Sequence, residues 1–113
     1  MSVGGKPDNP LFEVTDTTHR ALGRLVVLQL GEALSLRLTP VEAHTLALAM
    51  VAVRDGRSAE TELFLCPIAS DAIFLAQVVG DGLRVETPAG AYPLGWAAVG
   101  ELAAALSPAA MAA

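Results

Sequence analysis

The sequence has little cysteine, few aromatic residues and few cations. Cys66 is the single cysteine, so no disulfide can form within the chain. Aromatic residues make up 4% of the 113 residues, and 7 basic residues stand against 12 acidic ones, for a formal net charge of −5. Proteins that coat nucleic acid need many surface cations, so this balance argues against that class. With 53% hydrophobic residues, the chain has enough apolar side chains to fold as one small domain.

Long hydrophobic segments and targeting signals are also lacking. The longest apolar stretch, 41–53, is interrupted by Glu42 and His44 and is shorter than the roughly 20 residues that cross a bilayer. The first residues do not combine a positive start with an apolar run, as a secretory signal does. We therefore expect a cytoplasmic protein without a membrane-spanning segment.

The two ends of the sequence differ from its middle. Residues 1–10 are rich in glycine and proline and have almost no bulky side chains, which predicts a disordered arm. Residues 108–113 follow Ser107 and are mostly alanine, which predicts a frayed tail. Residues 11–107 remain as a single α+β domain.

The first half of this domain predicts strands followed by a helix. Apolar and β-branched residues predict strands at 12–18 and 25–30, and strict alternation predicts another at 33–38, joined to the second by a two-residue turn. Thr39, Pro40 and Glu42 have the spacing of a capping box with proline at the first helical position. The helix should run from Pro40 to about Val53.

The second half repeats this order. Strands are expected at 62–68, 72–79, 83–87 and 91–94, followed by a helix that ends near Leu106. This order predicts an α+β fold in which two helices cover one face of an antiparallel sheet. An offset of 56 residues suggests a pseudo-repeat of the strands-then-helix unit, since it pairs Leu38 with Leu94, Leu46 with Leu102, Ala47 with Ala103 and Met50 with Leu106.

The helix predicted from Pro40 has an unusual outer face. Its inner face is apolar, as packing on a sheet requires, but Val41, Leu48 and Ala52 make the opposite side apolar as well. A surface helix of a monomer normally carries more charge there, so we expect a second apolar surface against it. We predict that Val41, Leu48 and Ala52 lie in an interface, most simply that of a homodimer.

No residue pattern points to catalysis, a cofactor or a metal. Cys66 lies in an apolar strand without a nearby activating group, and we expect it to be buried and inert. His19 and His44 do not match a zinc spacing, and Glu60 with Glu62 are interpreted as solvated charges at a sheet edge. We therefore predict that the protein is not an enzyme and uses no cofactor.

Nucleic-acid binding is an alternative function. The repeated order of strands and helix is similar in outline to single-stranded DNA-binding folds of the Whirly and Pur type, which implies contacts from arginines on the strands and their connections. Here those residues are Arg24, Arg37, Arg54 and Arg57. The likeness is one of architecture alone, because this sequence lacks a stripe of cations and stacking aromatic residues.

The function that the sequence favours is a small acidic, non-enzymatic interaction or regulatory module that binds a protein partner or itself. All of the excess negative charge lies after Arg57, where Arg84 is the only cation. That half could therefore face a basic partner. A further alternative is an accessory or inhibitor subunit of a larger complex.

Overall fold

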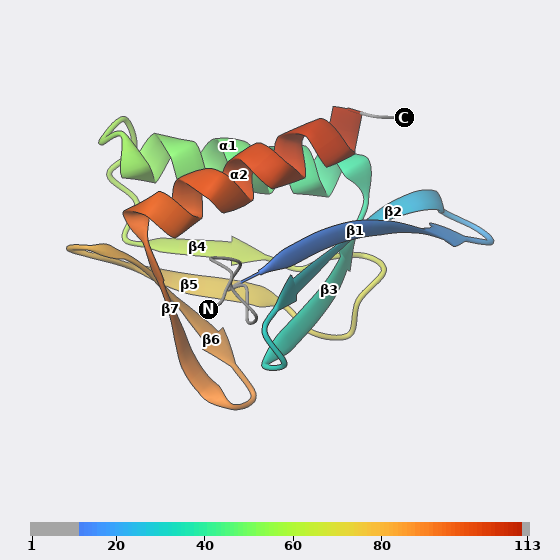
Figure 1. Ribbon diagram of the computed structural model, residues 1–113, viewed down its shortest axis with the longest axis horizontal. Helices are drawn as coiled ribbons and strands as arrows, with labels where there is room; N and C mark the ends of the chain where they lie inside the picture. Colours follow the sequence, from blue (N-terminus) through green and yellow to red (C-terminus); the bar gives the residue numbers. More distant parts are fainter. Residues whose placement is uncertain (1–11, 112–113) are drawn as a thin grey trace, which may run out of the picture.

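The computed structural model describes residues 12–111 and confirms an α+β fold with the strands-then-helix order. Figure 1 shows two helices side by side above the strands. The elements in chain order are β1 (Glu13–His19), β2 (Gly23–Leu30), β3 (Leu34–Leu38), α1 (Pro40–Arg54), β4 (Glu62–Leu65), β5 (Phe74–Val79), β6 (Gly82–Thr87), β7 (Gly90–Gly95) and α2 (Trp96–Met111).

The strands form two antiparallel sheets, whereas the sequence predicted one. The orders are β1-β2-β3 and β4-β5-β6-β7, each a simple meander. A loop, not a strand, borders β3, because the Arg37 backbone N–H donates to Ser70 Oγ at 2.6 Å and the Ser70 hydroxyl donates to the Arg37 carbonyl at 3.0 Å. Ser70 therefore occupies the backbone groups that would otherwise continue the sheet.

One hydrophobic core lies between the helices and both sheets. Alternation along the strands directs every second side chain toward the helices, as in β3, where the three leucines are buried and Ser35 and Arg37 are exposed. The core includes Leu28 and Leu36 from the first sheet, Phe74 and Val85 from the second, and Met50, Leu102 and Leu106 from the helices. The two sheets and two helices thus depend on the same buried surface.

The start of α1 has the predicted capping box. The Glu42 backbone N–H donates to Thr39 Oγ1 at 3.2 Å, and the Thr39 N–H donates to Glu42 Oε1 at 2.8 Å. The second carboxylate oxygen of Glu42 accepts from the Ile68 N–H at 3.1 Å. Glu42 therefore connects the beginning of the helix to the segment that follows β4.

The start of α2 is held differently. It follows β7 directly, and the Trp96 backbone N–H donates to the Asp81 carbonyl at 3.2 Å while its indole N–H donates to the Gly80 carbonyl at 3.1 Å. The helix continues to Met111, beyond the predicted end near Leu106, in a sequence rich in alanine, the strongest helix former. Of the predicted tail at 108–113, residues 112–113 lie outside the described residues, as does the predicted arm at 1–10.

The two halves also agree in position. The helices begin at Pro40 and Trp96, which are separated by the same 56 residues that relate the two sequence segments. Leu38 and Leu94 are both buried at the ends of their strands, and Leu46 and Leu102 are both buried in their helices. The offset therefore relates residues with the same place in each half.

Candidate interaction surface

The most exposed large apolar side chains come from one part of the fold. Among the described residues, Val41 is 74% exposed, Ile68 72%, Phe64 62% and Leu48 58%. All four belong to α1 or to the segment 62–68 that begins with β4. Phe64 lines a groove between α1 and β4, which we call the α1–β4 groove. Val41 and Leu48 share the outer face of α1, and exposed apolar side chains on one face are typical of interaction sites.

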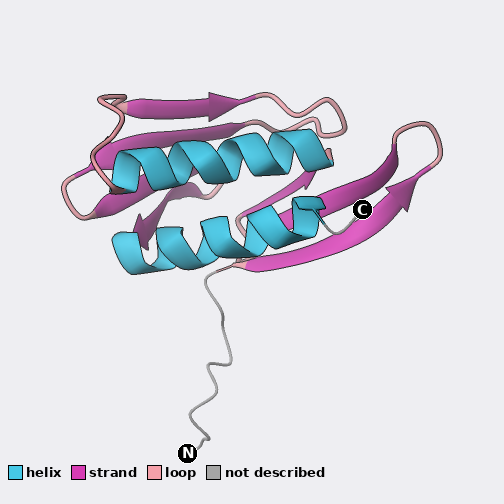
Figure 2. Cartoon of the chain, turned by 90° about the horizontal axis from the view of Figure 1, so that it is seen from above, coloured by secondary structure: helices cyan, strands magenta, loops and turns pink. Residues whose placement is uncertain are grey.

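The outer face of α1 contains all three residues predicted for an interface. Val41 and Leu48 are exposed, Ala52 is half-buried, and Thr45 is exposed between them. We refer to these four residues as the α1 stripe. The inner face packs on the core, and α2 lies along one flank of α1 (Figure 2). No described segment covers Val41 or Leu48. Their role in an interface stays a prediction.

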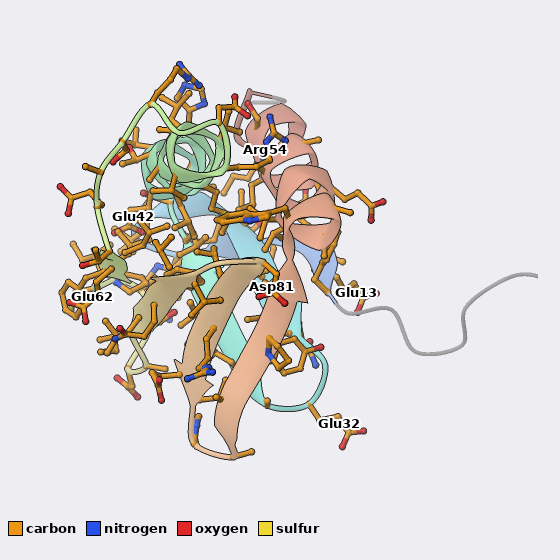
Figure 3. All side chains as sticks on the ribbon, turned by 90° about the vertical axis from the view of Figure 1, so that its left-hand side faces the viewer. Glu13, Glu32, Glu42, Arg54, Glu62 and Asp81 are labelled. Carbon is orange, nitrogen blue, oxygen red and sulfur yellow. The ribbon has the colours of Figure 1, made fainter. Side chains whose placement is uncertain are left out.

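A groove runs between α1 and β4 on the flank away from α2. Its volume is about 430 Å³, and its lining residues are Thr45, Leu46, Ala49, Glu60, Glu62, Leu63, Phe64 and Leu65. Small side chains on the helix leave this space open. The two glutamates make its rim acidic, and none of the described residues that line it is a cation. Figure 3 shows Glu42 and Glu62 on the same side of the molecule.

β4 borders this groove as the edge strand of its sheet. Its only strand partner among the described residues is β5. The Val78 N–H donates to the Thr61 carbonyl at 2.9 Å, with Glu62 opposite Gln77 and Phe64 opposite Leu75 in the register. Because hydrogen-bonded pairs alternate along an antiparallel ladder, the backbone groups of Leu63 and Leu65 point to β5. Those of Glu62 and Phe64 therefore point outward, toward the free edge.

Two expectations about this segment are wrong. The predicted strand 62–68 ends at Leu65, because Pro67 cannot donate a hydrogen bond to a continued ladder. Cys66, which we expected to be buried, is exposed, and Pro67 is buried instead. Phe64 is exposed, because alternation buries its neighbour Leu63 and turns Phe64 outward.

The sequence analysis did not identify Phe64 and Ile68 as surface residues. Pro67 is the signal that could have identified them, because a proline ends the strand before Ile68. In the short strand that remains, only alternate side chains can face the core. Glu60 and Glu62 are exposed, as their interpretation as edge charges implied. Within the described part of the chain, no three histidine, cysteine or acidic side chains cluster as metal ligands would.

The structure does not bring the four predicted arginines together. Arg24 is near the tip of the β1–β2 hairpin, whereas Arg54 and Arg57 are at the C-terminal end of α1, on the opposite side of the molecule in Figure 1. Arg37 donates from Nε to the Ala69 carbonyl at 3.3 Å. Arg24, Arg37 and the pair formed by Arg54 and Arg57 therefore lie at three separate places.

Two of these arginines interact with Asp55. Arg54 Nε donates to Asp55 Oδ1 at 2.9 Å, and Arg57 Nη2 lies 3.6 Å from Asp55 Oδ2. The hydrogen bond from Arg54 is the main cause that lowers the pKa of the Asp55 carboxyl, and the same bond raises the pKa of Arg54. These charges lie at the C-terminal end of α1, where Arg54 also approaches Gly100 of α2.

Comparisons with known proteins give no family for this chain. No protein-family model, curated protein or solved structure matches it. Among residues 12–111, no helix is both long and apolar enough to cross a bilayer. A function for this chain must therefore be sought in the chemistry of its own surface.

Proposed function

We propose that the chain is a non-enzymatic interaction module that pairs with a second copy of itself through the outer face of α1. The observation that supports this proposal most strongly is the exposure of Val41 and Leu48 on a helix whose opposite face is already buried. Burying each such side chain against apolar atoms contributes about 1.5–3 kcal/mol of transfer free energy. A second copy offers the same apolar stripe and therefore a matching surface.

The stripe is complementary to itself in the antiparallel direction. Val41, Thr45, Leu48 and Ala52 are separated by four, three and four residues, a spacing that reads the same from either end. About a two-fold axis, Val41 lies against Ala52 of the second copy, and Leu48 lies against Thr45 of the second copy. Each larger side chain thus meets a smaller one, which lets two helices approach closely.

The size of this stripe suggests a dimer of modest affinity. At a rise of 1.5 Å per residue, α1 is about 22 Å long. A standard stable interface buries about 800 Å² on each partner, so one helix face alone is at the lower end of that range. Ile68, adjacent to α1 through its bond to Glu42, extends the apolar contact. We therefore expect dimerisation that depends on protein concentration.

The experiment compares two leucine-to-aspartate variants by light scattering at about 100 μM protein. Leu48→Asp places a charge at the centre of the stripe and should give the mass of a monomer. Leu22→Asp is the matched control, since Leu22 is 39% exposed on the β1–β2 hairpin, and it should keep the mass of a dimer. A monomeric wild-type protein, or an unchanged mass for Leu48→Asp, would refute self-pairing.

A swap of two residues tests the antiparallel register. Leu48→Thr alone leaves threonine facing threonine and should weaken the dimer. Adding Thr45→Leu restores one large and one small residue at each contact, so the double variant should regain a dissociation constant near that of the wild type. If the second substitution gives no recovery, the helices pair in another register or not at all.

A further inference from the structure

The α1–β4 groove has a chemistry different from that of the α1 stripe. We propose that the free edge of β4 binds an extended segment of a partner protein in which apolar and basic side chains alternate. This segment would add one strand to the four-stranded sheet. The proposal does not depend on self-pairing, because it uses the edge of β4 and the groove, which share only Thr45 with the outer stripe of α1.

The backbone of β4 provides the first argument. Glu62 and Phe64 direct their N–H and C=O groups away from β5, as the β4–β5 register requires. Edge strands with free backbone groups accept added strands, and natural proteins usually prevent this with lysine, proline or a covering segment. Residues 62–65 contain no lysine or proline, and no described strand covers their outer edge.

The groove provides the second argument. Side chains of an added strand alternate between its two faces, so every second one would point toward α1. On that side it would meet Thr45, Ala49 and the apolar side chain of Leu63, with about 430 Å³ of open space. An apolar side chain of valine or leucine size fits this place, because the small residues of α1 leave the groove open.

Charge provides the third argument and selects the partner. Glu60 and Glu62 lie at the rim, Glu42 lies on the same side, and within residues 12–111 no cation lines the groove. The carboxylate of Glu62 accepts from Gln77 Nε2 at 3.0 Å, which orients it without neutralising it. Lysine or arginine side chains on the second face of the added strand would reach these carboxylates. A second copy of this chain would bring the same acidic residues to the edge, so charge favours a basic partner.

The probe for this proposal is a fluorescein-labelled nine-residue peptide of alternating valine and lysine, measured by fluorescence anisotropy with the full chain. We expect saturable binding that weakens as salt rises. A peptide of alternating valine and glutamate should not bind. Absence of binding by the lysine peptide at about 1 mM would refute the proposal.

Peptide N-methylation tests strand addition without changing the protein. In one peptide the backbone nitrogen of every lysine is methylated, and in the other the backbone nitrogen of every valine. Only one of these two sets can donate to β4, because the N–H groups of successive residues in a strand point in opposite directions. One methylated peptide should lose binding and the other should retain it. Equal binding of both peptides would show that the peptide does not pair with β4.

Substitutions locate the site. Glu60→Gln with Glu62→Gln should weaken binding about tenfold. Glu101→Gln, on the exposed face of α2, is the matched control and should leave affinity unchanged. Phe64→Pro removes an outward N–H but no bond to β5, so it should weaken binding while the fold is kept. Equal losses in the control would indicate non-specific attraction, and a lower protein mass for Phe64→Pro would assign the edge to a second copy. Either result would overturn the proposal.

Discussion

The first half of the molecule, β1–β3 with α1, and the second half, β4–β7 with α2, have the same layout but different surfaces. α1 exposes Val41 and Leu48, whereas the exposed residues described on α2 are Ala97, Glu101 and Ala104. The core positions of both helices are alike, so burial does not explain the difference. The comparison indicates that exposed large apolar side chains are a property of the outer face of α1, and not of helix packing in general.

Charge distinguishes the halves as well. Residues up to Arg57 have balanced charges, while the later residues have one cation and six acidic side chains. Glu60 and Glu62 belong to this later part and lie beside α1 at the groove. The apolar stripe of one half and the acidic edge of the other therefore adjoin, which gives the molecule two neighbouring surfaces of different chemistry.

The largest expected effect tests whether the two halves contribute equally to the core. Leu46→Ala and Leu102→Ala remove side chains that are 4% and 0% exposed at equivalent helix positions. Each should lower the free energy of unfolding by about 3 kcal/mol, because a cavity remains where the leucine was. Chemical denaturation measures both. Losses that differ by more than about 2 kcal/mol would contradict equivalent roles in the two halves.

A smaller effect is expected at a turn that belongs only to the second half. A Cβ on Gly82 would collide with the backbone carbonyl oxygen of Leu94, which cannot move without disturbing the pairing of β6 with β7. Gly82→Ala should therefore cost about 2 kcal/mol of stability. Gly80→Ala is the control, since a Cβ there meets no atom within 4 Å. Thermal unfolding of the two variants checks this, and equal melting temperatures would show that β7 adjusts freely.

The starts of the two helices give the next prediction. Glu42→Ala removes the acceptor of both the Thr39 and the Ile68 N–H groups and should cost about 1–2 kcal/mol. Trp96→Phe removes the indole bond to the Gly80 carbonyl and part of a ring packed against the core, and should cost about 1 kcal/mol. Urea denaturation compares the two variants. A larger loss for Trp96→Phe would mean that the contacts of Trp96 at the start of α2 contribute more stability than the capping box at the start of α1.

Local signals in the sequence were sufficient for most elements of the fold. Thr39, Pro40 and Glu42 form the capping box because its geometry involves only neighbouring residues. Alternation identified the strands for the same reason. The division into two sheets could not be predicted, since it depends on Ser70 binding the backbone of Arg37, a contact between residues 33 positions apart. A turn was also missed, because Leu30 pairs with Leu34 and leaves three residues between the strands.

The candidate surface was predicted only in part. The pattern of α1 placed Val41 and Leu48 on its outer face, and both are exposed. The edge of β4 was missed, because a short apolar run does not show which of its residues face the core. Phe64 and Leu63 are neighbours of similar hydrophobicity, and their opposite burial follows only from the pairing with β5.

The smallest expected effect concerns the C-terminal end of α1, which has an ion pair where the last turn of α2 has no basic residue. The hydrogen bond from Arg54, with further attraction from Arg57, holds the pKa of the Asp55 carboxyl below its usual value in the folded protein. Its contribution to stability is therefore present above the unfolded pKa and is lost as the pH falls through the folded one. Wild type should be slightly more stable than Asp55→Asn near pH 7, and the difference should begin to shrink as the pH falls below about 4, the pKa of an unfolded aspartate.

Urea denaturation at a series of pH values measures this difference. Asp71→Asn, which alters an exposed acidic residue of the second half, is the control and should give a smaller difference across the series. The effect is small because Asp55 is on the surface, where water and salt weaken ion pairs. A difference between wild type and Asp55→Asn that grows as the pH falls would contradict the lowered pKa. A difference that is the same at every pH would instead mean that the substitution acts through the packing of the end of α1 on α2, where Arg54 approaches Gly100, and not through charge.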